Sequence, residues 1–388
     1  MSSKINKIEK LISSKITFLG AGPMSRAVVD QVILLANKIK KPIALIPSRR
    51  QIECDQLGGG YVENWTTEEF ASYVQRFDDG GFVVLSRDHC GPFQISPKKP
   101  GESSPDLLTE MNQVKISLQS DIESGFEIIH IDPSLALKFG HTQDKIREIA
   151  FELITFCESV KPNFLTYEIG TEEQEHLSKT IDQSQFELNE ILVGLQELKL
   201  PKPRFFVQQT GTKVQELRNV GSFDNELDSK GVLPSSVQVP LILKMCQKEG
   251  VWLKEHNADY LSDNALIWHK RFGIHSANIA PEFGVIETKA LLKLANQIKA
   301  LSLVSEFEEI VLAGKKWEKW MIPNSKATNS EKVLIAGHYH FSEEWAKKWR
   351  RNLFEASEKK KIDGEAQIKS AIEVGLKRYL HPFGYFNE

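Results

Sequence analysis

The feature that most constrains the fold is an alternation of short apolar runs with amphipathic stretches, repeated eight times in about the first 280 residues. The runs are rich in Val, Ile, Leu and Phe and lack strict apolar–polar alternation, as in strands of a parallel sheet buried on both faces. They are Lys15–Gly22, Pro42–Arg49, Phe82–Cys90, Phe126–Ser134, Phe164–Glu172, Arg204–Thr212, Val251–Asp259 and Phe272–Ala280.

Helical periodicity fills most of the gaps between these runs. Examples of these predicted helices are Met24–Lys40, Thr67–Phe77, Leu107–Ser124, Gln143–Val160, Gln185–Leu198 and Val237–Glu249. Eight strand–helix alternations favour a closed barrel over an open sheet. The sequence therefore predicts an α/β fold, a (β/α)8 TIM barrel over residues 1–300.

The character of the chain changes after about Leu301. Trp317, Trp320, Trp345 and Trp349 alternate with Lys and Glu, and Ile368–Tyr379 has helical periodicity. We expect residues 301–388 to form a helical extension packed on the barrel. The polar segment 323–331 is predicted to be a loop.

Composition excludes several classes of protein. Of the 388 residues, 41% are hydrophobic and 26% charged, and the net charge of −3 argues against a nucleic-acid partner. No apolar run approaches the roughly 18 residues of a membrane span, and the polar N-terminal residues lack a signal core. The four cysteines show no CxxC spacing, so free thiols in a cytoplasmic protein are expected.

Polar residues gather where the predicted strands end. In a (β/α)8 barrel these carboxyl ends surround the active site. The residues are Arg49, Arg50, Gln51, Asp88, His89, Asp132, Glu168, Glu172, Gln208, Gln209, Glu255, His256, Asn257, His275 and Asn278. Histidines and carboxylates from different strands suit a divalent cation, although structural hydrogen bonding explains such residues equally well.

The strongest local signal is Asp88-His89, followed by Cys90-Gly91-Pro92. Consecutive residues of a strand point to opposite faces, unless the strand is ending. At a strand end both side chains reach the mouth, one as a metal ligand and the other as a proton-transfer group.

Several ordered motifs give the chain a resemblance to a known family. SRDHCGP, HIDPS, YEIGTEE and EHNADYLSDNA occur in this order, with QIECDQLGGGYVENWTTEEF before them and FGIHSANIAPEFGVIETKAL after them. The chain resembles the accessory ("non-catalytic") subunits of tagatose-bisphosphate aldolase. That family is similar to class II, metal-dependent aldolases, and some members are C4 epimerases of ketoses or ketose phosphates.

The resemblance implies roles for particular residues. His89 matches the first metal histidine of class II aldolases, and Asp88 matches their proton-transfer aspartate. Glu172 matches a repeated acidic position of the family, for which the resemblance implies catalytic and metal-binding roles. Glu168 matches a further glutamate, for which it implies a role as metal ligand. His256 lies on the strand of a later metal histidine, whereas Gln209 stands where class II aldolases carry another histidine ligand.

The resemblance implies a metal-dependent enzyme of carbohydrate metabolism, an aldolase-type lyase or ketose(-phosphate) C4-epimerase, using Zn, or else Mn or Co. The alternative is a non-catalytic subunit that stabilises a separate class II tagatose-bisphosphate aldolase. A ketose or ketose phosphate is the expected ligand, and a homo-oligomer or a complex with such an aldolase is the expected assembly. Expected substrate or phosphate contacts are Arg49, Gln51, Asp132, Gln208, Asn257, Ser276 and Asn278.

Two other signals compete with this interpretation. Gly20-Ala21-Gly22 between a strand and a helix resembles a dinucleotide-binding turn, but Ser25 replaces the third glycine. His338 and His340 have the spacing of a surface strand. We expect His130, like His269, to be structural.

Overall fold

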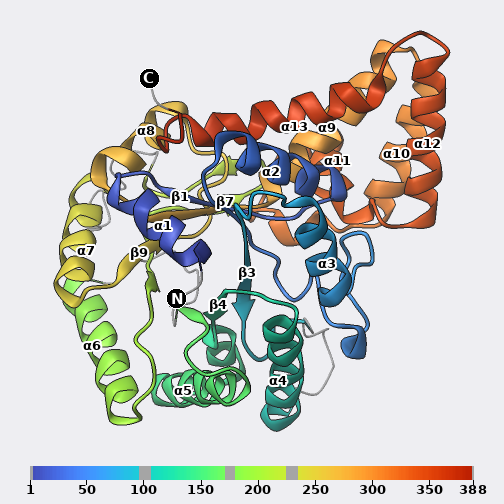
Figure 1. Cartoon of the computed structure of the whole chain (residues 1–388). Helices are drawn as coiled ribbons and strands as arrows, with labels where there is room; N and C mark the ends of the chain where they lie inside the picture. Colours follow the sequence, from blue (N-terminus) through green and yellow to red (C-terminus); the bar gives the residue numbers. More distant parts are fainter. Residues whose placement is uncertain (1–2, 96–105, 171–179, 224–234, 387–388) are drawn as a thin grey trace.

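Eight parallel strands close into a barrel, which confirms the predicted fold class (Figure 1). The computed structural model describes residues 3–95, 106–170, 180–223 and 235–386. The barrel strands are β1 (Phe18–Ala21), β2 (Ile43–Leu45), β3 (Val83–Cys90), β4 (Ile128–Ile131), β5 (Thr166–Ile169), β6 (Phe205–Val207), β9 (Trp252–Glu255) and β10 (Ser276–Ile279). They neighbour one another in the order β1-β10-β9-β6-β5-β4-β3-β2.

The strands are almost wholly buried, as their apolar composition requires. A short hairpin, β7 (Val214–Gln215) with β8 (Arg218–Asn219), follows β6 outside the barrel. Parallel register places His130 of β4 beside Glu168 of β5. The carboxyl ends of these strands therefore meet at one mouth.

Helices separate most of the strands and cover the barrel (Figure 1). They are α2 (Arg26–Ile39), α3 (Thr67–Phe77), α4 (Leu107–Glu123), α5 (Gln143–Val160), α6 (Ile181–Glu197), α7 (Ser235–Glu249), α8 (Asp263–Phe272) and α9 (Pro281–Gln297). α6 begins four residues before the predicted start, because Thr180 and Gln183 form a capping box there. α8 is not among the helices given as examples from the sequence, although Ser262 caps its first turn.

The N-terminal helix α1 (Ser3–Ser13) precedes the barrel, and four helices follow it: α10 (Leu301–Ala313), α11 (Asn329–Ala336), α12 (Glu344–Glu358) and α13 (Gly364–Leu380). α13 packs against α9 and α2. Beyond α13, the Tyr385 hydroxyl donates to the Pro42 carbonyl at 2.9 Å and accepts from the Leu19 amide at 3.0 Å. The last residues are thereby joined to the first two strands.

The tryptophan-rich part of the chain packs these helices together. The Trp349 indole donates to the Leu303 carbonyl at 2.7 Å, and its ring lies 4.7 Å from that of Phe307. Two expectations for this region were wrong. The loop predicted over 323–331 ends early because Thr328 caps α11, and His338 and His340 are buried in the 3-10 helix η4 (Gly337–His340) rather than on a surface strand.

Among the described helices, none combines the length and the apolar composition needed to cross a bilayer. Cys54, Cys90, Cys157 and Cys246 are buried free thiols, as predicted.

Candidate metal centre

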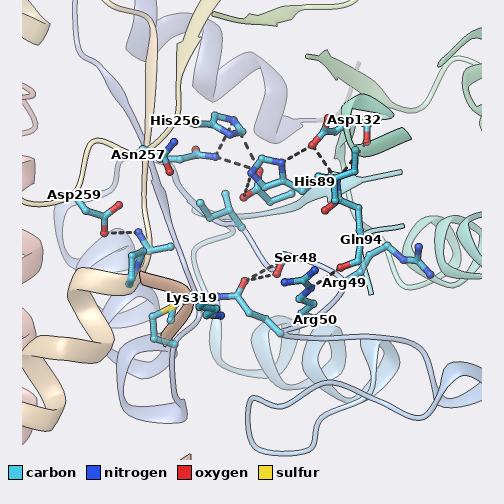
Figure 2. A pocket seen from close by; sticks show the side chains of 18 of the residues that line it. Ser48, Arg49, Arg50, His89, Gln94, Asp132, His256, Asn257, Asp259 and Lys319 are labelled. Atoms are coloured by element: carbon cyan, nitrogen blue, oxygen red, sulfur yellow. Dashed lines mark hydrogen bonds and ion pairs between the residues drawn. The ribbon is translucent and has the colours of Figure 1, made fainter. Parts of the chain in front are cut away.

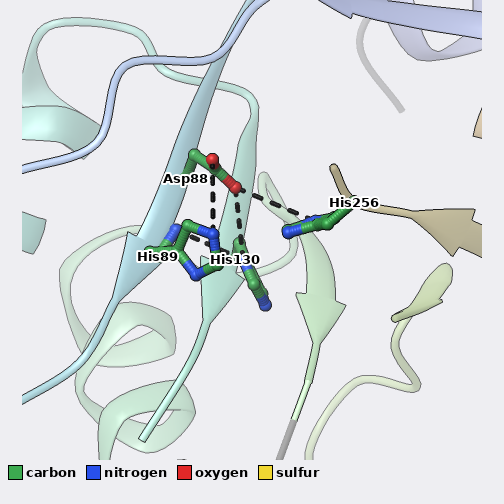
Figure 3. Close-up of side chains that lie close together, drawn as sticks. All are labelled: Asp88, His89, His130 and His256. Atoms are coloured by element: carbon green, nitrogen blue, oxygen red, sulfur yellow. Dashed lines mark hydrogen bonds and ion pairs between the residues drawn. The ribbon is translucent and has the colours of Figure 1, made fainter. Parts of the chain in front are cut away.

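Four side chains converge at the carboxyl ends of three strands: Asp88 and His89 from β3, His130 from β4, and His256 directly after β9 (Figure 3). Each offers a nitrogen or oxygen ligand atom, and these atoms all lie within 4.8 Å of one another. Asp88 Oδ1 lies 3.4 Å from Nδ1 of His130 and 3.9 Å from Nε2 of His256. These four residues are called the histidine cluster below.

An irregularity in β3 directs the consecutive side chains of Asp88 and His89 into the same cluster. The register with β4 shifts between Arg87 and Cys90, and His89 has a left-handed backbone with φ of 47°. A non-glycine residue in this region is strained, and such strain is common at functional sites. Asp88 and His89 therefore both reach the histidine cluster, whereas the guanidinium of Arg87 is buried against Asp121.

Hydrogen bonds fix the two imidazoles next to Asp88. Asp132 Oδ2 lies 2.6 Å from Nδ1 of His89, which leaves Nε2 directed at the cluster, 3.7 Å from Asp88 Oδ2. The backbone amide of His89 donates to Nδ1 of His130 at 3.2 Å. A carboxylate that holds the far nitrogen of a histidine is the usual support of a metal ligand.

Beneath His256, a fully buried carboxylate completes the arrangement. Glu168 Oε1 lies 2.8 Å from Nε2 of His256, and Glu168 Oε2 accepts from Lys254 Nζ at 2.5 Å. The amide nitrogen of Asn278 lies 3.3 Å from Nε2 of His256 and 3.4 Å from Asp88 Oδ1. Nε2 of His256 is therefore contacted by both a carboxylate and an amide.

Charges within the cluster shift the acidities of its members. Burial opposes the charging of His89, but Asp88 and Asp132 raise its pKa to about 9. Burial would raise the pKa of Asp88, yet the nearby charges of His89 and His256 hold it far below its usual range. Burial lowers the pKa of His256. Asp88 is therefore ionised near neutral pH.

The cluster could hold a metal ion. Nε2 of His130 is a buried nitrogen without a partner in the described part of the chain, and imidazole with carboxylate suits Zn, Mn or Co. Ligand atoms of a tetrahedral zinc site lie about 3.4 Å apart at the usual bond lengths. The separations here, up to 4.8 Å, would shorten by up to about 1.4 Å on binding of the ion.

The predicted ligands are not all in the cluster. His89 and His256 belong to it, whereas Glu168 is engaged with Lys254 as well as with His256. Gln209 lines a smaller cavity of about 20 Å³ next to the cluster. Glu172, predicted as both ligand and catalytic group, lies outside the described residues.

Sequence reasoning assigned His130 a structural role and missed its place in the cluster. The signal was available, because strand residues alternate sides and His130 stands two positions before Asp132 in a run predicted as a strand.

A cavity of about 510 Å³ opens over the cluster at the mouth of the barrel, and it is called the mouth pocket (Figure 2). In the view of Figure 2, His89, His256 and Asp132 occupy one side, and Arg49, Arg50 and Lys319 the other. Lys319 comes from the 3-10 helix η3 (Glu318–Trp320), beyond the last barrel strand. The chain after the barrel thus contributes to the pocket wall.

Of the predicted substrate contacts, five line the mouth pocket: Arg49, Gln51, Asp132, Asn257 and Asn278. Gln51 is already engaged, because its amide oxygen accepts from the Ser48 amide at 2.8 Å. Gln208 lies beside the smaller cavity.

Three predicted mouth residues are elsewhere. Ser276 is a correction: it begins β10, and its buried hydroxyl donates to the Phe18 carbonyl at 2.9 Å. His275 precedes β10 and lines a cavity with residues of the amino-terminal side. The Glu255 carboxylate is buried against His269 at 2.5 Å. The predicted run 272–280 is longer than β10 and extends beyond both of its ends. Polar residues of one run can therefore lie at opposite ends of the barrel.

The glycine pair near β1 has a packing explanation in place of a dinucleotide. A Cβ at Gly20 would lie 2.2 Å from Oδ1 of Asn278, and one at Gly22 would lie 2.4 Å from Cβ of Ala280. Only glycine fits where β1 passes these residues. The closed barrel also lacks the open sheet edge of a dinucleotide-binding fold.

Comparison with known proteins shows the fold. No protein-family model matches the chain, and no curated protein sequence does. A crystal structure described as a probable tagatose 6 phosphate kinase from Sinorhizobium meliloti superposes with a TM-score of 0.74 at 16% identity, covering 94% of this chain and 100% of that one. The fructose-bisphosphate aldolase of Campylobacter jejuni superposes with a TM-score of 0.52 at 10% identity, covering 97% and 93% respectively.

Proposed function

We propose that the mouth pocket binds a ketose phosphate beside a divalent cation, Zn or else Mn or Co, and supports aldol chemistry on it. The outcome is either cleavage by an aldolase-type lyase or epimerisation at C4. The observation that carries this proposal is the placement of one ionised carboxylate, Asp88, among His89, His130 and His256 at the barrel mouth.

The three imidazoles are the proposed ligands of the cation. When bound there, a divalent cation acts as a Lewis acid towards the carbonyl and hydroxyl oxygens of the sugar. Asp132 orients His89 by holding Nδ1 from 2.6 Å. Glu168 contacts Nε2 of His256 at 2.8 Å, the nitrogen that also lies 3.9 Å from Asp88, so a cation bound there would take the place of this contact. The Asp132 contact keeps His89 in place before substrate arrives.

Asp88 is the proposed proton-transfer group. Its ionised carboxylate takes the proton of the C4 hydroxyl while the C3–C4 bond breaks. The bonding pair moves into an enediolate over C2 and C3, and C4 becomes an aldehyde. Return of the pair to the other face of that aldehyde, with the proton given back by Asp88, yields the C4 epimer.

Turnover by the metal-loaded protein tests this proposal. The purified chain is loaded in turn with Zn, Mn and Co and incubated with ketoses, ketose monophosphates and ketose bisphosphates, and the products are identified by NMR. Chelator-treated protein is the control. Turnover that depends on the added metal is the expected result, and a metal-loaded protein inert towards the whole panel contradicts an enzymatic role.

A second candidate is a non-catalytic subunit that stabilises a separate class II tagatose-bisphosphate aldolase. At similar coverage the chain superposes better on the S. meliloti protein, which is not described as an aldolase, than on the C. jejuni aldolase. Gln209, which stands where class II aldolases carry a histidine, agrees with this second candidate.

Mixing experiments test the accessory role. We expect an accessory chain to co-purify with a class II tagatose-bisphosphate aldolase and to raise its melting temperature. The Asp88→Asn variant should retain both effects if the role is structural. An active metalloprotein that neither binds nor stabilises such an aldolase excludes this role.

A further inference from the structure

The wall of the mouth pocket away from the histidine cluster is basic. Arg49 and Arg50 follow β2, and Lys319 comes from η3 (Figure 2). Within the described part of the chain, no carboxylate lies within ion-pair distance of Arg50 or Lys319, whereas Arg49 is paired with Glu53 at 2.8 Å. Two positive charges on this wall are therefore not neutralised by the described residues.

Arg49 adds a donor that has no acceptor. Its side chain is buried, with Nε donating to Glu53 and Nη1 donating to the Gly91 carbonyl at 3.3 Å. Nη2 is also buried and lacks a partner among the described residues. A buried guanidinium nitrogen without an acceptor is costly, and Arg49 is among the residues that line the mouth pocket.

Aromatic rings hold Lys319 in place. Its Nζ lies 4.2 Å from the centre of the Tyr339 ring and 5.3 Å from that of Trp320. The Trp320 indole donates to the Tyr339 hydroxyl at 3.1 Å, so the two rings are fixed to one another. Burial, then Arg50 and Lys316, lower the pKa of Lys319 to about 8. An anion placed between the two cations would offset their mutual repulsion.

The other obvious place for an anion is already filled. Barrels often bind phosphate near the last two strands, at a helix N-terminus. Here Asp259 Oδ1 accepts from the amides of Ala280 and Glu282, at 3.0 and 2.9 Å, at the start of α9. Glu282 itself stands in that first turn and accepts from the Tyr260 amide at 2.6 Å. A second phosphate would meet occupied donors and acidic side chains.

We infer that Arg49, Arg50 and Lys319 form the subsite for one phosphomonoester, carried on the end of the ketose away from the histidine cluster. This inference deepens the proposed function and rests on it for the ketose. Two unneutralised cations match the dianionic charge of a phosphomonoester. Because the start of α9 is filled, the preferred ligand is a ketose monophosphate rather than a bisphosphate.

Direct binding measurements test the subsite without requiring turnover. Calorimetric titration of the full chain, metal-loaded and chelator-treated, would use D-tagatose 6-phosphate, D-tagatose and D-tagatose 1,6-bisphosphate as probes. Charge-assisted hydrogen bonds are the stronger kind, so Lys319→Met and Arg50→Met should each weaken 6-phosphate binding at least about 10-fold. Lys348→Met, on the exposed face of α12, is the matched control and should bind as the wild type does.

Three results would overturn the subsite: unchanged 6-phosphate affinity in Lys319→Met, a bisphosphate that binds 10-fold tighter than the monophosphate, or no saturable 6-phosphate binding. The readout separates the inference from the proposed function. If the protein shows no turnover but Lys319→Met weakens binding of the 6-phosphate, the phosphate subsite is supported and the enzymatic role is rejected. If the protein is active and Lys319→Met leaves its KM for a ketose phosphate unchanged, the enzymatic role is supported and the phosphate subsite is rejected.

Discussion

Asp132 Oδ2 lies 2.6 Å from Nδ1 of His89, so a carboxylate at the end of β4 orients an imidazole at the end of β3. Asp132 is itself held, because its other oxygen accepts from the Ser134 amide at 3.1 Å. The free nitrogen of His89 therefore has one direction available, towards Asp88 and His256.

Removing this support should weaken metal binding. We expect Asp132→Ala to lower the affinity for Zn about 10- to 100-fold, the range found when the partner of a metal-bound histidine is removed. Competition with a chromophoric chelator measures the affinity. Asp144→Ala, at an exposed carboxylate on α5, is the control. Equal affinities for the two variants would show that Asp132 does not position His89 for a metal.

Asp88 is predicted to transfer the proton. Asp88→Asn should reduce turnover about 100-fold or more, because an amide cannot accept the hydroxyl proton. Bound metal, measured by elemental analysis, should remain if the three histidines carry the ion. Activity retained in this variant would show that Asp88 is not the proton-transfer group and would assign that role to another carboxylate of the mouth, such as Glu168.

His130 and His256 should act as one unit. Each single change to Ala is expected to remove the metal, and the double variant should then lose little more of the metal-dependent rise in melting temperature. Thermal melts with and without Zn, on four proteins, measure the coupling. Losses that add, with metal content unchanged, would indicate two independent structural histidines.

The metal-free protein should lose stability as pH rises. His89 in the folded chain has a pKa of about 9, above the value of about 6.5 expected in the unfolded chain. The folded state therefore favours the charged imidazole, and this contribution is complete below pH 6.5 and lost as pH rises through 9. Melting temperatures of chelator-treated wild type and His89→Gln at these two pH values measure it. A pH dependence that is the same in both would contradict the assignment.

The sequence predicted the barrel because every strand is an apolar run and most intervening stretches have helical periodicity. It also placed Asp88, His89 and His256 at the mouth, since polar residues that end a buried strand have few other places to go. It could not separate the two ends of a run: Ser276 begins β10, whereas Asn278, two residues later, faces the cluster.

Contacts between distant segments were beyond sequence reasoning. Lys319 lies in a tryptophan-rich segment that reads as packing, and only tertiary structure brings it to the pocket wall with Arg50. The left-handed backbone of His89 is similar, because the shift in register with β4 depends on the neighbouring strand. Buried His338 and His340 were misread because their spacing fits a strand as well as a 3-10 turn.

Metal stoichiometry tests the central claim most directly. The wild-type chain, dialysed against Zn and then against metal-free buffer, should retain about one ion per chain, and Co should give the absorption of a nitrogen- and oxygen-ligated ion. His89→Ala, His130→Ala and His256→Ala should each retain almost none while keeping the circular dichroism of the folded barrel. A wild-type protein that retains no ion, or a triple histidine variant that retains as much as the wild type, would contradict a metal centre at this mouth.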